Sequence, residues 1–349
     1  MPRAILHGSL ALLWLAVGCA HGIARASEAT ALPEHLRDTG LYADVSMSQL
    51  QPGVLPFSPQ YPLWSDGATK RRWIKLPAGT SIDATQPDAW DFPRGTKLWK
   101  EFSHAGRVET RFIERVVDGS WRYASYVWSA DEQDAVLAPA TGIRDLPVPS
   151  APGARYSIPG QDDCRACHEG APVPVLGFSA LQLSPDRDRQ APHADAADSA
   201  LSRMDLRTLA SRGLLVHLPS ELLVSPPRIA AANPTERAAL GYLHANCGHC
   251  HNDEGPLAVL EMSLAQRVGT KESAGSVLRS IASVPGQFRM AGGTARLAPG
   301  HPDASVIALR MRSREPLQQM PPLGTSEVDF EAMSLIARWI ESLPIHQPK

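Results

Sequence analysis

The sequence has no long block of like charges. Its 349 residues include 34 Lys and Arg against 36 Asp and Glu, and the formal net charge is -2. Nucleic-acid-binding proteins carry a strongly basic surface, so this balance excludes nucleic acid as the expected partner. The chain also lacks an apolar run of about 20 residues, the length that a transmembrane helix needs. No transmembrane segment is therefore predicted.

Cysteine is scarce, and after the N-terminal leader none is left over for a structural disulfide. Four of the five cysteines lie in two copies of one motif, C-x-x-C-H, and the fifth is Cys19. The first copy runs from Cys164 through Cys167 to His168, and the second from Cys247 through Cys250 to His251. The motif is typical of covalent haem c attachment: both thiols bind the haem, and the histidine is an axial ligand of the iron.

Two alternatives exist for these cysteines, a four-cysteine zinc site and two local disulfides. A zinc ribbon usually has about 15–20 residues between its cysteine pairs, whereas residues 168–246 separate Cys167 from Cys247. The histidine that follows both pairs also favours haem. We therefore predict two covalent haem c groups, with Cys164, Cys167, Cys247 and Cys250 binding the cofactor and His168 and His251 binding iron.

Residues 1–26 are predicted to be an export signal. Arg3 precedes a short apolar run, and Ala24, Arg25 and Ala26 form an A-x-A cleavage site before Ser27. The expected location is the periplasm, where c-type haem is attached. An alternative is a lipoprotein tethered to the membrane through an acylated Cys19.

Residues 27–138 are predicted to form a Trp-rich antiparallel β domain resembling a sandwich. Runs such as 72–76 and 110–117 alternate apolar and polar residues, and Asp118-Gly119 predicts a hairpin before residues 121–128. Six of the eight tryptophans lie in this segment and are interpreted as core packing. Prolines in 139–161 predict a linker, followed by a first haem region at 162–232 and a second at 233–349.

The surroundings of the second motif are the more informative. A helix is predicted from Pro234 to Ala245, with Asn233 as its cap. Met320 lies in a Met-Pro-Pro turn, and Thr325-Ser326-Glu327 is predicted to cap a final amphipathic helix. This order resembles class I cytochromes c, which are all-α. The resemblance implies an all-α class I-like region, with Met320 as the distal iron ligand.

The first motif has no Met-Pro turn before residue 233. The candidates for its distal ligand are Met204, Met290, His193 and His217, and an open or water-bound position is a further alternative.

The chain as a whole resembles a family of exported bacterial dihaem c-type cytochromes, with segments similar to modules of quinoprotein sugar dehydrogenases. The matching segments include residues 61–67, 90–96, 126–128, 242–251 and 320–324. The resemblance implies haem c binding and electron transfer. It does not identify the donor or the acceptor.

Three functions follow as expectations. The first is a non-catalytic electron carrier between a periplasmic dehydrogenase, or another donor, and an acceptor such as an oxidase. The second is a dihaem peroxidase-like enzyme with an open first haem. The third is a carbohydrate-binding β domain with a redox tail.

Overall fold

The computed structural model describes residues 31–194, 204–270, 272–293 and 295–345. The predicted export signal and Cys19 lie outside these ranges. The chain divides into two compact units, Met1–Glu34 and His35–Lys349, and the fold described below is that of the second unit. The domain boundaries predicted at residues 138, 161 and 232 all fall within this second unit and stay predictions.

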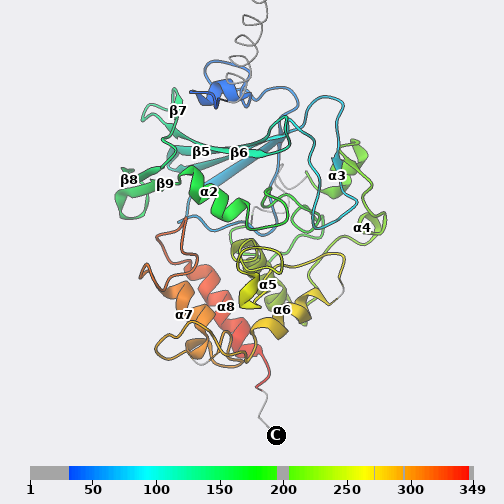
Figure 1. Ribbon diagram of the computed structural model, residues 1–349, viewed down its shortest axis with the longest axis vertical. Helices are drawn as coiled ribbons and strands as arrows, with labels where there is room; N and C mark the ends of the chain where they lie inside the picture. Colours follow the sequence, from blue (N-terminus) through cyan, green and yellow to red (C-terminus); the bar gives the residue numbers. More distant parts are fainter. Residues whose placement is uncertain (1–30, 195–203, 271, 294, 346–349) are drawn as a thin grey trace, which may run out of the picture. The chain divides into compact units, whose positions relative to one another are not determined.

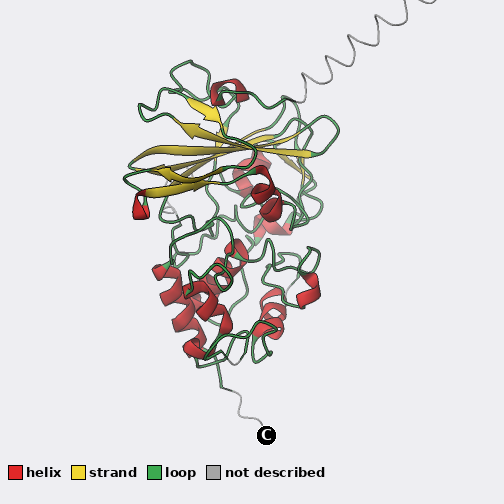
Figure 2. Ribbon diagram, turned by 60° about the vertical axis from the view of Figure 1, so that its left-hand side comes forward, coloured by secondary structure: helices red, strands yellow, loops and turns green. Residues whose placement is uncertain are grey.

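A six-stranded antiparallel sheet is the largest element of the fold (Figures 1 and 2). Its strand order is β1-β2-β4-β5-β6-β7. The strands are β1 (Leu55–Pro56), β2 (Thr69–Lys75), β4 (Lys97–His104), β5 (Gly106–Arg115), β6 (Trp121–Trp128) and β7 (Ala135–Leu137). The predicted hairpin is confirmed: β5 pairs with β6, and Gly119 takes a positive φ of 94° in the turn between them.

The sheet has both faces covered. On one face, Trp99 packs against Phe112, and its indole nitrogen donates a hydrogen bond to Thr39 Oγ1 at 2.9 Å, next to the short helix η1 (Leu36–Thr39). The other face shares a core with segments that follow the first motif, among them Phe178, Leu183, Leu206 and Leu209. Trp73, Trp90, Trp99 and Trp128 are buried, as expected for core tryptophans.

The predicted β sandwich is therefore wrong. The main strands hydrogen-bond edge to edge in one sheet, and the cover of its second face comes from loops and short helices instead of a facing sheet. Two small strand pairs complete the β structure. β3 (Ile82–Asp83) pairs in parallel with β10 (Leu215–Val216), and β8 (Ile143–Pro147) pairs with β9 (Arg155–Ile158) within the predicted linker.

The α-helices are short. They are α2 (Gln161–His168), α3 (Leu206–Ser211), α4 (Glu221–Val224), α5 (Pro234–Asn246), α6 (Ser273–Ile281), α7 (Val306–Arg312) and α8 (Phe330–Ser342). Single 3₁₀ turns occur at η2 (Pro152–Ala154), η3 (Ala258–Leu260) and η4 (Pro302–Ala304).

The helix predicted before the second motif is confirmed as α5. Asn233 caps it by accepting a hydrogen bond from Glu236 N at 2.9 Å, and Pro234 occupies the first turn. The final helix is confirmed as α8, but its cap is Asp329 rather than Thr325. The two helices share one core, in which Ala239 and Leu243 of α5 and Trp339 and Ile340 of α8 are fully buried.

The predicted all-α class I-like region is also wrong. After α5 the described part of the chain runs mostly as irregular loops, interrupted by α6, α7, α8 and the single turns η3 and η4. Isolated β-bridges join Ala282 to Leu297 and Ala295 to Ser305. Prolines such as Pro256, Pro285 and Pro299 lie in these loops. Because proline has no backbone N–H and clashes with the preceding turn, it stops helices from extending there. Upstream of α5, β10 pairs with β3, so the region of the first motif shares backbone hydrogen bonds with the β part.

Within the described ranges, no helix is long and apolar enough to cross a membrane.

Candidate functional site

The two C-x-x-C-H motifs are presented by different local structures. The first occupies α2 and ends at its last residue, His168. The Asp163 carboxylate accepts a hydrogen bond from Gly160 N at 3.0 Å and so caps the start of this helix. The second motif begins at the C-cap of α5, where His251 N donates to Cys247 O at 2.8 Å and closes a single turn. Each local turn places two thiols and a histidine close together.

The fold brings the two motifs into direct contact. Cys250 Sγ lies 3.9 Å from the carbonyl oxygen of Ala166, and Asn252 Nδ2 donates to Gly170 O at 2.8 Å. The approach is close enough to require glycine: a Cβ on Gly255 would collide with Gly170 O, and one on Gly170 would lie 3.0 Å from His249 O. Two motifs far apart in sequence thus form one site.

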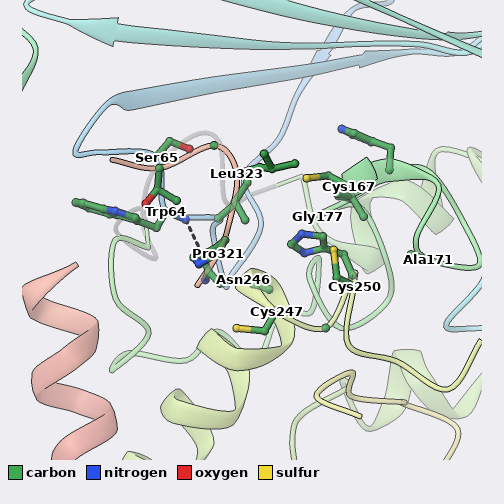
Figure 3. Close-up of a pocket in the computed structure, with 18 of the residues that line it drawn as sticks. Trp64, Ser65, Cys167, Ala171, Gly177, Asn246, Cys247, Cys250, Pro321 and Leu323 are labelled. Carbon is green, nitrogen blue, oxygen red and sulfur yellow. Dashed lines mark hydrogen bonds between the residues drawn. The ribbon is translucent and has the colours of Figure 1, made fainter. Parts of the chain in front are cut away.

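A cavity of about 1190 Å³ lies at this junction and is lined by all four cysteines of the motifs, by His168 and His251, and by Met320. Pockets for one small ligand commonly measure about 300–1,000 Å³, so this one has room for more than a single small molecule. Figure 3 draws the cavity wall, with Cys167 on one side, Cys247 and Cys250 on another, and Pro321 and Leu323 from the loop before α8. The hydrogen bond from Trp64 N to Asn246 Oδ1, 2.7 Å, fixes a further part of this wall (Figure 3).

The histidine of the first motif is held in a form that can bind a metal. His168 Nδ1 donates to the carbonyl oxygen of Pro174 at 2.5 Å, which leaves Nε2 with its lone pair. Burial lowers the pKa of His168 to about 4, with the charges of Lys100 and Arg111 adding to the effect, so the imidazole is neutral at pH 7. Its ring lies 5.3 Å from that of Tyr123 on β6. These contacts fix the ring orientation.

The histidine of the second motif is less constrained. Burial lowers the pKa of His251, with Arg310 and Arg296 contributing. Its Nδ1 is buried without a hydrogen-bond partner among the described residues. A buried polar atom of this kind is costly unless another group satisfies it, and without such a partner the ring of His251 is less firmly fixed than that of His168.

The four thiols are not set up for thiol–disulfide chemistry. All four cysteines are free, and burial raises the pKa of Cys247 to about 12 and those of Cys164 and Cys250 to about 11. Reactive dithiols instead have lowered pKa values, because the thiolate is the nucleophile. Nor does any group of three or more His, Cys, Asp or Glu in the described part of the chain form a metal site.

The methionine and histidine candidates for distal iron ligands differ in whether they line the cavity. Met320 lies in the cavity wall, and its N–H donates to Arg310 O at 3.0 Å. The four candidates for the first motif do not line the cavity. His193 Nε2 contacts Asp329 at 2.9 Å, His217 contacts Asp83 at 3.1 Å, and Met204 packs in the core beside the sheet.

Several cavity residues were not predicted from the sequence. They are Lys100 and His104 on β4, Arg72 on β2, Arg111 on β5, His244 on α5, His249 within the second motif, and Met262. The alternation of β4 puts Lys100, Phe102 and His104 on one strand face, which is a usable signal. Which face meets the motifs depends on the packing of α2, and the sequence carries no local signal for that packing.

Comparison of the chain with protein-family models, with curated proteins and with solved structures gave no match.

Proposed function

We propose that this chain is an electron-transfer protein that carries two covalently attached haem c groups, one on each C-x-x-C-H motif. The observation that carries the proposal is the convergence of both motifs, with free thiols and neutral histidines, on one cavity of about 1190 Å³. Haem, when bound, supplies an iron that alternates between the ferric and ferrous states.

The chain's own residues have distinct roles in this proposal. Cys164, Cys167, Cys247 and Cys250 hold the cofactors by adding each S–H across a vinyl group, a step without a leaving group. His168 and His251 each offer Nε2 to iron, and Met320 offers a soft thioether at the second site. The wall of this cavity combines side chains of the sheet with side chains of the loops and helices that follow it, and it is only partly buried.

The contact between the motifs supports electron transfer between the two groups. Ala166 and Cys250 belong to different motifs and lie within 3.9 Å of each other. Groups held by the two motifs would therefore lie close to each other, an arrangement that would suit electron exchange between them.

We further propose export to the periplasm and a redox protein as partner, either a dehydrogenase that donates electrons or an oxidase that accepts them. Cleavage after Ala26 predicts a mature N-terminus at Ser27 and recovery in the periplasmic fraction. Recovery in membranes with a blocked N-terminus at Cys19 would assign the lipoprotein alternative instead. We expect no catalysis by the chain itself.

The test is the intact mass of the denatured protein, produced in a host that attaches haem c. We expect the mass of the mature chain plus two haem groups, and a pyridine haemochrome spectrum that gives two haems per chain. A mass equal to the bare chain, with all four thiols open to alkylation, would disprove the proposal. Rapid turnover of hydrogen peroxide by the loaded protein would favour the peroxidase-like alternative.

A further inference from the structure

Three cationic side chains form a row across the middle of the sheet. The register pairs Arg72 of β2 with Lys100 of β4, and Lys100 in turn with Arg111 of β5. Directly paired residues on neighbouring strands point to the same face, and like charges opposite each other are destabilising. A row of this kind needs negative charge nearby.

The row faces the cavity on the side of the first motif. Arg72, Lys100 and Arg111 all line the cavity. Ile113, on the same face of β5 as Arg111, is paired with Tyr123 of β6, and the ring centroid of Tyr123 lies 5.3 Å from that of His168. The row therefore lies on the face of the sheet against which the first motif packs.

The protein itself supplies only part of the negative charge. Glu109, which is fully buried, pairs with Arg111 at 2.9 Å and 3.0 Å and accepts a hydrogen bond from Tyr156 at 2.8 Å. Lys100 has no ion pair or hydrogen bond with any residue that the structure describes. The nearest group recorded for its ammonium is the ring of Phe102, whose centroid lies 4.8 Å away.

The environment of Lys100 is unfavourable for a charge. Burial lowers its pKa well below the usual range, and the neighbouring cations Arg72, Lys70 and Arg111 lower it further, whereas the charge of Glu109 acts in the opposite direction. An anion bound against the row would reverse this effect and keep the ammonium charged.

We propose that Lys100, within the row that it forms with Arg72 and Arg111, binds the propionate carboxylates of the haem attached to the first motif. This inference rests on the proposed function, and it adds a set of residues that positions one particular haem. A carboxylate at Lys100 adds to the negative charge of Glu109 opposite the three cations of the row. The positive row, in turn, favours the reduced state of that haem, because reduction adds a negative charge near it.

The variant Lys100→Met tests the proposal, since it removes the charge while keeping a long side chain. The matched control is Lys75→Met, which makes the same change on the opposite face of β2, away from the cavity. Both are prepared with haem attached and titrated spectroelectrochemically, and resonance Raman spectra record the propionate bending band. We expect Lys100→Met to lower the midpoint potential of one of the two haems and to shift this band, while Lys75→Met behaves as wild type.

Three results would overturn the proposal. The first is a Lys100→Met protein with the same potentials and propionate band as Lys75→Met. The second is a wild-type potential that varies with added acetate, together with a Lys100→Met potential that does not and an unchanged propionate band. That result would mean that Lys100 binds a free carboxylate instead of a propionate. The third is a change of spin state in the variant, which would assign Lys100 as an axial ligand.

Two further measurements keep the test decisive. If Lys100→Met fails to retain haem, Lys100→Arg is measured instead, because it preserves the positive charge. Both of its midpoint potentials should lie near those of wild type, and a lowered potential in Lys100→Arg would contradict the proposal. The wild-type mass separates the two hypotheses. If the wild-type protein does not carry two haems, the proposed function is wrong. If it carries two haems and Lys100→Met has the same potentials and propionate band as wild type, only the propionate assignment is wrong.

Discussion

The two motifs share one cavity but lie in unlike surroundings. His168 is fixed between the sheet and a loop: Nδ1 donates to Pro174 O, and its ring meets Tyr123. His251 has a buried Nδ1 without a partner among the described residues, and its end of the fold contributes Met262, Met311 and Met320 to the cavity wall. The first site is therefore polar and cationic, the second rich in thioethers. We expect two haems with different ligands and different redox potentials.

The largest effect should come from removing one attachment site. The double variant Cys164→Ser, Cys167→Ser should carry one haem instead of two, because each motif supplies its own pair of thiols. Cys247→Ser, Cys250→Ser should also carry one. Intact mass measures both. Loss of both haems from either variant would mean that the two sites do not load independently.

The next effect concerns the thioether side of the comparison. Met320→Leu should retain both haems but lower the potential of one and open its iron to carbon monoxide or cyanide, because the distal donor is lost. A volume-conserving change costs less than about 1.5 kcal/mol of stability, so folding should survive. Met204→Leu, outside the cavity, is the control. If Met320→Leu binds no added ligand, Met262 is the next candidate.

A smaller effect concerns two histidines of the cavity wall that differ in their hydrogen bonds. His168 Nδ1 donates, whereas His244 Nδ1 accepts a hydrogen bond from Gln266 N at 3.0 Å. Burial lowers the pKa of His244 to about 4, below the ordinary value of 6.5. The unfolded state therefore binds the proton first as pH falls. The contribution of His244 to the free energy of unfolding is complete above about pH 6.5, is lost progressively between pH 6.5 and 4, and amounts to about 3 kcal/mol.

The variant His244→Gln should reduce this loss, since it does not titrate. Urea unfolding of wild type and variant at pH 7, 5.5 and 4.5 measures the difference. The free energy of unfolding of wild type should fall more steeply over this range. Equal slopes would show that His244 is not the group responsible.

The smallest effect tests the contact that joins the motifs. Gly255→Ala places a Cβ against Gly170 O, and overpacking of this kind costs about 1–3 kcal/mol. Gly269→Ala is the control, because its Cβ would lie 3.8 Å from Pro87 Cγ and meets only ordinary contact. Thermal unfolding should rank Gly255→Ala below both the control and wild type. Equal melting temperatures would mean that the two motifs can move apart without cost.

Local signals in the sequence predicted individual elements well. Alternation and Asp118-Gly119 predicted β5 and β6, and Asn233-Pro234 predicted the start of α5, because turns and caps depend on residues close together in the chain. The cap of α8 was predicted at Thr325 but lies at Asp329, since several polar residues before that helix could serve. The two larger predictions failed for different reasons. The sandwich concerned how strands are arranged in space, whereas the all-α region overlooked prolines such as Pro256, Pro285 and Pro299, which keep the loops between α5 and α7 from becoming helical.

The sequence by itself determined the chemistry that is available: four cysteines in two C-x-x-C-H motifs, each followed by its histidine, and a methionine in a proline-rich turn. These are local patterns, and their spacing alone carries the hypothesis. Only the tertiary structure decided that the two motifs touch and that Lys100 faces the first of them. It also decided which candidate ligands line the cavity: Met320 does, whereas Met204, Met290, His193 and His217 do not. Those facts depend on strand register and on which sheet face covers α2, and both are set by contacts between residues far apart in the chain.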